Sequence, residues 1–192
     1  VFEKANISYV KNNNVLKNVS IKIEPGEKVA IVGPTGSGKS TIIKLILRFY
    51  DLNNGKITID GTDIKKFSLK NLRSQVSLVS QDIFLFADSI YNNISLFNKS
   101  ISRIEVENAA KEIGIFDFIK KLPGGFDYNV KERGVMLSEG QRQLISFLRA
   151  YVSNPKILIL DEATSSIDSK TEQLIQYATN KIIADKTSII IA

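Results

Sequence analysis

A run of nine residues near the start of the chain has the composition and spacing of a phosphate-binding loop. The run reads Gly33-Pro34-Thr35-Gly36-Ser37-Gly38-Lys39-Ser40-Thr41 and fits the pattern G-x-x-x-x-G-K-[ST]. Its glycines let successive backbone N–H groups close around an anion, and the Lys39 ammonium adds a positive charge against the β- and γ-phosphates. The Ser40 hydroxyl is suited to bind Mg²⁺. The alternative interpretation is a flexible turn before a helix.

Two acidic residues near the other end of the chain supply groups that phosphoryl transfer still lacks. Asp161 and Glu162 directly follow a predicted apolar strand at 156–160. Asp161 can hold the ligand shell of Mg²⁺, and Glu162 can orient or deprotonate a water in line with the γ-phosphate. The alternative is a pair of surface carboxylates, but a phosphate loop in the same chain favours the functional interpretation. Gln81 follows another predicted strand, where α/β sheets place ligand-contacting side chains.

The segments around these residues predict an α/β fold with a parallel sheet. An apolar run at 29–32 leads into the phosphate loop, and a mostly apolar helix at about 40–48 leads out of it. Further strands are predicted at 56–61, 76–79, 156–160 and 187–191. The unbroken apolar character of the strand at 156–160 is typical of a sheet that is covered on both faces.

Two smaller parts accompany this predicted core. Alternating segments at 6–10 and 19–23, separated by an asparagine turn at 12–14, predict an antiparallel β subdomain. Residues 88–153 are predicted to be mainly helical. Capping patterns are expected to begin helices at Ser102, Ser138 and Ser169. Tyr9 is either a packed strand residue or an aromatic that stacks on adenine.

The composition of the 192 residues excludes several kinds of site. The chain has no cysteine and no histidine, so it has no disulfide, no thiolate metal site and no histidine base. It contains neither a signal peptide nor an apolar run near the ~20 residues that a membrane helix needs. The net charge of +6 comes from scattered lysines, which favours a solvated surface over a basic face that binds nucleic acid or an anionic membrane. Both termini read as cuts in a longer polypeptide.

Two stretches in the second half of the chain carry a resemblance to a known family. Residues 137–143 read Leu-Ser-Glu-Gly-Gln-Arg-Gln, and residues 157–165 read Ile-Leu-Ile-Leu-Asp-Glu-Ala-Thr-Ser. Together with the phosphate loop they resemble the nucleotide-binding domain of ATP-binding-cassette (ABC) transporters, over essentially all of 1–192. The resemblance implies a RecA-like P-loop NTPase core with an antiparallel β subdomain, together 1–86 and 154–192. It also implies a helical subdomain at 87–153 and a truncated C-terminus.

This resemblance implies roles for the matching residues, with ATP and Mg²⁺ as cofactors. Tyr9 is the adenine-stacking aromatic, 33–41 is the Walker A loop, and the signature residues close on the γ-phosphate held by another subunit. The implied nucleotide-binding residues are Tyr9, Gly33, Pro34, Thr35, Gly36, Ser37, Gly38, Lys39, Ser40, Thr41, Ser138, Gly140 and Gln141. The implied catalytic residues are Glu162, Gln81 and Lys39, and the implied metal ligands are Ser40, Gln81 and Asp161.

A finer resemblance, to ABC exporters, bears on the partners. Residues 131–134 look like the exporter loop whose glutamate meets the coupling helices of the membrane domain, which implies contact through Glu132 and the Gln81 loop. A second nucleotide-binding domain, in a homo- or heterodimer, is the other implied partner, and no nucleic acid is expected. The implied function is ATP-driven export at the cytoplasmic face of the membrane. The alternatives are a non-transport ABC ATPase and an importer ATPase subunit.

The chain departs from the family pattern at two places. Glu139 stands where the signature commonly has glycine, and we expect its side chain to point away from the phosphate. The switch histidine of the family follows a run like 187–192, so we expect it just beyond Ala192. Residues 165–168 resemble the D-loop, which contacts the partner domain.

Overall fold

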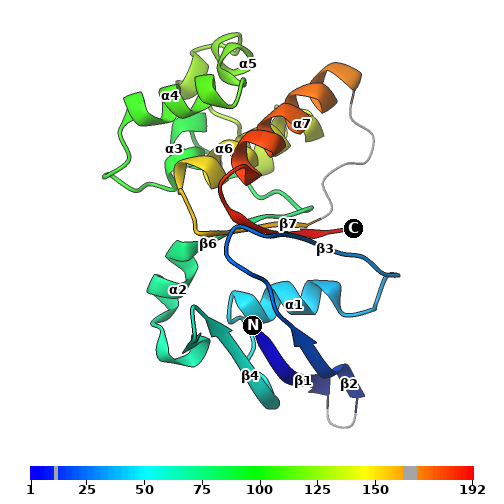
Figure 1. The fold of residues 1–192 in the computed structure, drawn as a ribbon. Coiled ribbons are helices and arrows are strands. Elements are labelled where there is room, and N and C mark those ends of the chain that lie inside the picture. Colours follow the sequence, from blue (N-terminus) through cyan, green and yellow to red (C-terminus); the bar gives the residue numbers. More distant parts are fainter. Residues whose placement is uncertain (11–12, 162–167) are drawn as a thin grey trace. The chain divides into compact units, whose positions relative to one another are not determined.

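The computed structural model describes residues 1–10, 13–161 and 168–192, and Figure 1 shows the order of their elements. Contacts divide the chain into two compact units. The first unit comprises Val1–Ser77, Lys156–Asp161 and Lys186–Ala192. The second comprises Leu78–Pro155 and the described part of Glu162–Asp185. No helix in the described ranges is long and apolar enough to cross a membrane.

A four-stranded parallel sheet forms the predicted core. Its strand order is β3-β8-β7-β6. The strands are β3 (Lys28–Ile31), β8 (Thr187–Ile191), β7 (Ile157–Asp161) and β6 (Val76–Val79). The sequence prediction of a parallel sheet is confirmed, and the predicted strands at 76–79 and 187–191 coincide with β6 and β8. Leu158 and Ile159 of β7 are fully buried, as expected for a central strand.

An antiparallel sheet in the order β2-β1-β4-β5 makes up the rest of the first unit's strands. They are β2 (Asn13–Ile21), β1 (Phe2–Val10), β4 (Asn54–Ile59) and β5 (Thr62–Asp63). The predicted asparagine turn is wrong at Asn13 and Asn14, which belong to β2 and pair with Val10 and Ser8. Ladder pairing with β1 outweighs the low strand propensity of asparagine. Residue 12 lies outside the described residues.

Short helices complete the first unit. They are α1 (Lys39–Ile46), η1 (Ile64–Lys66) and α2 (Leu69–Gln75). The predicted helix after the phosphate loop is therefore confirmed, with its end two residues earlier than expected. Most of α1 is buried, because apolar side chains lie on several of its sides.

Residues 88–153 are mainly helical, as predicted, and they lie in the second unit. Its helices are α3 (Ile90–Ser95), α4 (Arg103–Glu112), α5 (Phe116–Lys120), η2 (Gly125–Asp127), η3 (Glu132–Gly134), α6 (Glu139–Val152) and α7 (Ser169–Ile183). Both predicted capping boxes form, at Ser102 and at Ser138. The predicted cap at Ser169 is wrong, because the Asp168 carboxylate caps α7 by accepting from the Thr171 N–H at 3.0 Å. Aspartate caps as well as serine does, and the helix begins one residue later than its cap.

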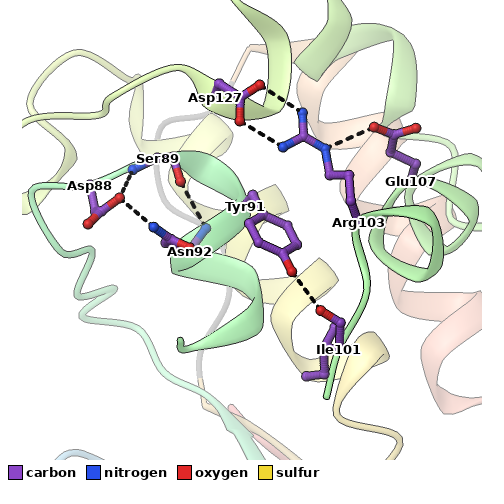
Figure 2. A network of polar contacts seen from close by, with 8 residues as sticks. All are labelled: Asp88, Ser89, Tyr91, Asn92, Ile101, Arg103, Glu107 and Asp127. Atoms are coloured by element: carbon purple, nitrogen blue, oxygen red, sulfur yellow. Dashed lines mark hydrogen bonds and ion pairs between the residues drawn. The ribbon is translucent and has the colours of Figure 1, made fainter. Parts of the chain in front are cut away.

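One arginine joins three segments around α4 (Figure 2). The Arg103 guanidinium donates twice to Asp127, at 2.8 and 3.2 Å, and once to Glu107 at 2.9 Å. It also lies over the rings of Tyr91 and Phe126, with centroids 5.4 and 4.9 Å away. The hydrogen bonds from Arg103 hold the pKa of Asp127 below its usual value. The cluster therefore depends on an ionised carboxylate.

Replacing Arg103 by glutamine is expected to lower the free energy of unfolding by about 1 kcal/mol at neutral pH, since partly exposed ion pairs contribute little more. The pKa of Asp127 is lower in the folded state, so its contribution is present above about pH 4 and is lost as the pH falls through the folded-state value. Urea titrations between about pH 3 and pH 7 should show the difference shrinking below about pH 4. Replacing the exposed Lys99 by glutamine is the charge-matched control. A difference that is unchanged at the acid end contradicts the assignment.

The start of β4 has no room for a side chain beyond glycine. Gly55 has φ +92°, and a Cβ there would lie 2.3 Å from the Lys4 carbonyl oxygen and 2.6 Å from that of Glu3. Both of these atoms belong to the backbone of β1, which cannot move aside without breaking the sheet. Gly55 therefore permits the close approach of β1 and β4.

Gly55→Ala is expected to lower the free energy of unfolding by about 3 kcal/mol, because backbone overlap adds to the cost of a positive φ. Gly26→Ala is the matched control: Gly26 has φ +79°, but a Cβ at this position would meet no atom within 4 Å. That control should lose only about 1 kcal/mol. Urea denaturation measures both, and equal losses would show that conformational strain alone decides the effect.

Candidate active site

The phosphate-loop residues connect β3 to α1 within the first unit. Gly36 and Gly38 have φ +82° and +95°, in the left-handed region that favours glycine. A Cβ at Gly38 would lie 2.7 Å from the Leu16 side chain, and one at Gly33 would lie 2.9 Å from the Ser37 hydroxyl oxygen. Conformation therefore favours glycine at Gly36 and Gly38, and packing against Leu16 adds to this at Gly38. The loop residues before Gly38 are exposed, and within the loop the Ser37 N–H donates to the Pro34 carbonyl oxygen at 3.1 Å.

The helix that follows this loop begins without a capping side chain. Its N-cap is Gly38, and its first turn contains no acidic residue. By contrast, α2, α3, α4, α6 and α7 each begin with a serine or aspartate whose side chain accepts a backbone N–H. An uncapped N-terminus presents free N–H groups and the positive end of the helix dipole. The donors at the start of α1 therefore fit a phosphate group.

The two side chains expected to act on the phosphates lie in the first turn of α1. The Lys39 ammonium reaches back over the loop and donates to the carbonyl oxygens of Gly33 and Pro34. Rotation of its flexible side chain can turn the same charge toward a phosphate oxygen without moving the backbone. Ser40 is exposed, and its hydroxyl is the kind of oxygen ligand that Mg²⁺ takes.

Strand register places Asp161 at the same sheet edge as the phosphate loop. Ile31, the last residue of β3, pairs with Ile191 of β8, and Asp161 of β7 pairs with the same Ile191. Parallel strands lie about 4.8 Å apart, so Asp161 stands two strands, or about 10 Å, from the end of the strand that leads into the loop. Asp161 is partly buried. Its carboxylate oxygens are of the kind that Mg²⁺ takes as ligands.

Tyr9 contacts the first turn of α1. It stands near the end of β1, and its hydroxyl donates to the Thr41 hydroxyl oxygen at 3.1 Å. Thr41 is buried, whereas Tyr9 keeps 42% of its surface exposed. The structure thus brings together two residues that are 32 positions apart in the chain and that were both predicted to contact the nucleotide.

The signature residues form the N-terminus of α6 in the second unit. The Ser138 hydroxyl oxygen accepts from the Gln141 N–H at 3.3 Å, and the Gln141 side-chain oxygen accepts from the Ser138 N–H at 3.0 Å. A hydroxyl that accepts in a cap still has its own O–H to donate, so Ser138 keeps a donor for a phosphate oxygen. Gly140 is buried in the helix, and Glu139 is exposed.

Gln81 stands two residues beyond β6, exposed, in the second unit. The segment that follows it is fastened to α6 by Arg149, whose guanidinium donates to the carbonyl oxygens of Phe84, at 3.2 Å, and Asn93, at 2.8 Å. Burial lowers the pKa of Arg149. The link means that the region after Gln81 and the signature helix share one hydrogen-bonded anchor. Nothing in the sequence pattern pointed to Arg149.

Backbone pairing provides a second link between the Gln81 segment and the loop before the signature. The Ile90 N–H donates to the Tyr128 carbonyl at 3.0 Å, and the Val130 N–H donates to the Asp88 carbonyl at 3.1 Å. Asp88 is itself ordered by the Asn92 side chain, which donates to its carboxylate at 2.8 Å (Figure 2). The backbone of residues 128–130 is therefore paired just before Glu132, where η3 begins.

The predicted site residues thus fall into two described groups. The first unit contains Tyr9, the phosphate loop and Asp161, and the second contains Gln81, Ser138, Gly140 and Gln141. Glu162 and the D-loop residues 165–167 lie outside the described residues. The sequence motifs assigned no site role to Tyr50, whose ring meets that of Tyr9 at a centroid distance of 4.8 Å. Its position just past α1, the helix that follows the phosphate loop, was the hint that the sequence offered.

Comparisons with known proteins identify a family. Residues 16–165 match the ABC transporter family. The chain is 48% identical over 193 aligned positions to an ATP-dependent lipid A-core flippase of Pectobacterium atrosepticum. It is 44% identical over 192 positions to a putative multidrug export ATP-binding/permease protein of Bacillus subtilis. Each alignment covers 100% of this chain and 33% of the relative.

A solved structure shows the same fold. The structure of a bacterial Atm1-family ABC exporter with ATP bound superimposes with a TM-score of 0.91 at 43% sequence identity. The match covers 100% of this chain and 33% of that one. The chain therefore spans about a third of the length of the relatives it matches.

Two substitutions at the start of α6 should separate capping from the hydroxyl group itself. Ser138→Ala is expected to lower the free energy of unfolding by about 1 kcal/mol, because the Gln141 N–H loses its acceptor. Ser138→Asp keeps a capping oxygen and should stay within a few tenths of a kcal/mol of the parent. Urea denaturation measures both values. Equal losses in the two variants would mean that the cap is not what Ser138 contributes to stability.

Proposed function

Because the chain belongs to the ABC transporter family, we propose that it is the ATP-binding and ATP-hydrolysing domain of an exporter. The observation that carries the proposal is the register that sets Asp161 two strands from the phosphate loop, beside an uncapped helix N-terminus. A triphosphate held by the loop would then have a carboxylate within reach of its metal ion.

Most of the proposed nucleotide-binding residues lie in the first unit, and Gln81 belongs to the second. Backbone N–H groups of 33–41 and the Lys39 ammonium bind the phosphates, and the Tyr9 ring stacks on adenine. Mg²⁺, when bound, neutralises charge on the β- and γ-phosphates, and Ser40, Asp161 and Gln81 are its proposed protein ligands. Tyr9 lies near enough to the loop for one nucleotide to reach both, because its hydroxyl already contacts Thr41.

Hydrolysis needs a water aligned with the γ-phosphate. We assign its orientation and deprotonation to Glu162, with Gln81 as a second polar contact to that water. Glu162 directly follows Asp161, the last residue of β7, so both carboxylates come from the carboxyl end of one strand in the sequence. The proposed catalytic residues are therefore Glu162, Gln81 and Lys39.

A single chain holds only half of each proposed site. The α6 N-terminus of one domain would face the γ-phosphate on a second domain, with Ser138, Gly140 and Gln141 at the contact. The Ser138 O–H remains able to donate, and the helix dipole favours an anion at this point. Two domains packed head to tail would thus enclose two ATP molecules, as a homodimer or a heterodimer.

For transport, dimerisation of the nucleotide-binding domains must change the conformation of the membrane domain. We propose that this chain contacts the membrane domain through Glu132 and through the segment after Gln81. Three exposed phenylalanines, Phe84, Phe86 and Phe97, lie ring against ring on that segment and beside α3, with centroids 5.1 and 5.7 Å apart. An exposed aromatic cluster of this kind favours a protein contact. Arg149 ties the cluster's backbone to α6.

The exporter assignment is favoured over its alternatives by the relatives. Those relatives are named as a flippase and as ATP-binding/permease proteins, and this chain matches a third of each. An importer subunit or a non-transport ABC ATPase fits those names less well. The proposal places the domain at the cytoplasmic face of a membrane. We propose the same division of the chain as above: an ATP-binding core at 1–86 and 154–192, and a helical subdomain at 87–153.

Glu162→Gln tests the hydrolytic assignment. The amide cannot accept the proton of the attacking water, so ATP turnover should fall by at least about 100-fold while ATP binding persists. The uncleaved nucleotide should trap a dimer of the chain, which size-exclusion chromatography with multi-angle light scattering detects. Turnover at the parent rate would show that Glu162 is not the base.

Lys39→Ala is the companion control for binding. Loss of the ammonium should abolish measurable ATP binding in calorimetry without unfolding the chain, because Lys39 lies at the surface of the loop. Unchanged ATP affinity in Lys39→Ala would contradict the phosphate-loop assignment.

A further inference from the structure

We propose that Tyr50 is a positioning residue for nucleotide recognition, which holds the Tyr9 ring in the orientation that stacks on adenine. The inference rests on the ATP-binding function proposed above and adds a residue to which that function assigns no role. The two rings meet at a centroid distance of 4.8 Å with an interplanar angle of 69°. This is the edge-to-face arrangement that aromatic pairs prefer. Tyr9 and Tyr50 remain 42% and 47% exposed, so neither ring is enclosed by the protein core.

The Tyr9 side chain is held at its other end as well. Its hydroxyl donates to the Thr41 hydroxyl oxygen at 3.1 Å, and Thr41 is buried in the first turn of α1. The ring is thus restrained by one contact at the start of α1 and by a second contact just past its end. A side chain that is already ordered loses less rotamer freedom when a ligand binds, so more of the stacking energy appears as affinity.

Tyr50 can act as a restraint because the turn that precedes it is well ordered. The Arg48 N–H donates to the Leu45 carbonyl at 3.1 Å, and the Phe49 N–H donates to the Lys44 carbonyl at 2.8 Å. With Arg48 at φ +51°, these bonds form a Schellman motif at the end of α1. A non-glycine residue in this conformation is strained and persists only where its surroundings hold it.

Two arginine side chains stabilise this turn. Arg73 donates to the carbonyl oxygens of Leu47 and Arg48, at 3.0 and 3.3 Å. The Arg48 guanidinium donates to the carbonyl oxygens of Ile64 and Phe67, at 3.2 and 3.0 Å. Cations that bind the last carbonyls of a helix also complement its dipole. The ordered end of α1 therefore places Tyr50 at a defined position, with its ring against Tyr9 of β1.

The experiment compares two ligands of the 192-residue chain by isothermal calorimetry: ATP with Mg²⁺, and inorganic tripolyphosphate with Mg²⁺. Tripolyphosphate engages the loop but has no base. Tyr50→Ala should weaken ATP binding by about threefold to tenfold, which is the range expected for an aromatic pair. Its affinity for tripolyphosphate should match the parent's.

Two controls isolate the ring contact. Tyr50→Phe keeps the ring and should bind ATP as the parent does. Tyr177→Ala removes another tyrosine with the same exposure of 47%, in α7 of the second unit, and should leave both affinities unchanged. Parent-like ATP affinity in Tyr50→Ala overturns the inference, and so does a parallel loss of ATP and tripolyphosphate binding. If the parent chain itself binds no ATP, the proposed function fails instead.

A spectroscopic measurement keeps the inference testable should Tyr50→Ala fold poorly. The chain contains no tryptophan, so Tyr9→Trp introduces a single indole at the proposed stacking position. Fluorescence anisotropy of that indole should fall when Tyr50→Leu is added, because an aliphatic side chain cannot form the edge-to-face pair. Equal anisotropy with and without Tyr50 would show that Tyr50 does not restrain the ring.

Discussion

The parallel pairing of β3, β8 and β7 is the constraint on which the candidate site depends. Ile31 and Asp161 share one partner, Ile191, so the end of β3 and the end of β7 are level across the sheet. A shift of one residue in either pairing would move Asp161 by about 3.3 Å along the strand and turn its side chain to the other face. The buried side chains of β7, Leu158 to Leu160, specify the register because each must remain within the core.

The N-termini of α1 and α6 differ in capping: α1 has no capping side chain, whereas α6 has a capping box. Both arrangements are compatible with an anion near the helix start. The start of α1 has glycine in place of a capping side chain, so its N–H groups face the loop. The start of α6 is capped by Ser138 and Gln141, yet the hydroxyl keeps a proton to donate. The first arrangement can hold a phosphate within one chain. The second is a stable helix end that can meet a phosphate presented by another chain.

The second unit is stiffened where coupling to a membrane domain is proposed. Arg149 of α6 binds two backbone carbonyls, and the strand-like pairing of 88–90 with 128–130 connects the Gln81 segment to Glu132. Gly134, with φ +70°, packs so closely that a Cβ would lie 2.7 Å from the Leu85 side chain. These contacts join the proposed docking residues and the signature helix in one hydrogen-bonded body. Displacement of one is therefore expected to be transmitted to the other.

The sequence predicted those features that depend on residues close to one another in the chain. The phosphate loop, the capping boxes at Ser102 and Ser138, and the apolar strand before Asp161 all have periods or spacings shorter than one helix or strand. Predictions failed where two local signals competed, as at Asn13 and Asn14, which pair with β1, and at Asp168, which caps α7 in place of Ser169.

Contacts between distant segments were decided only by the tertiary structure. The Tyr9–Thr41 hydrogen bond, the Tyr9–Tyr50 ring pair and the carbonyl contacts of Arg149 join residues that no periodicity relates. Their geometry depends on how β1 lies beside α1 and how α3 packs against α6, which side-chain volume and backbone register determine together. The sequence by itself thus predicted a phosphate site with its carboxylate. The fold decided which aromatic and basic side chains lie against those residues.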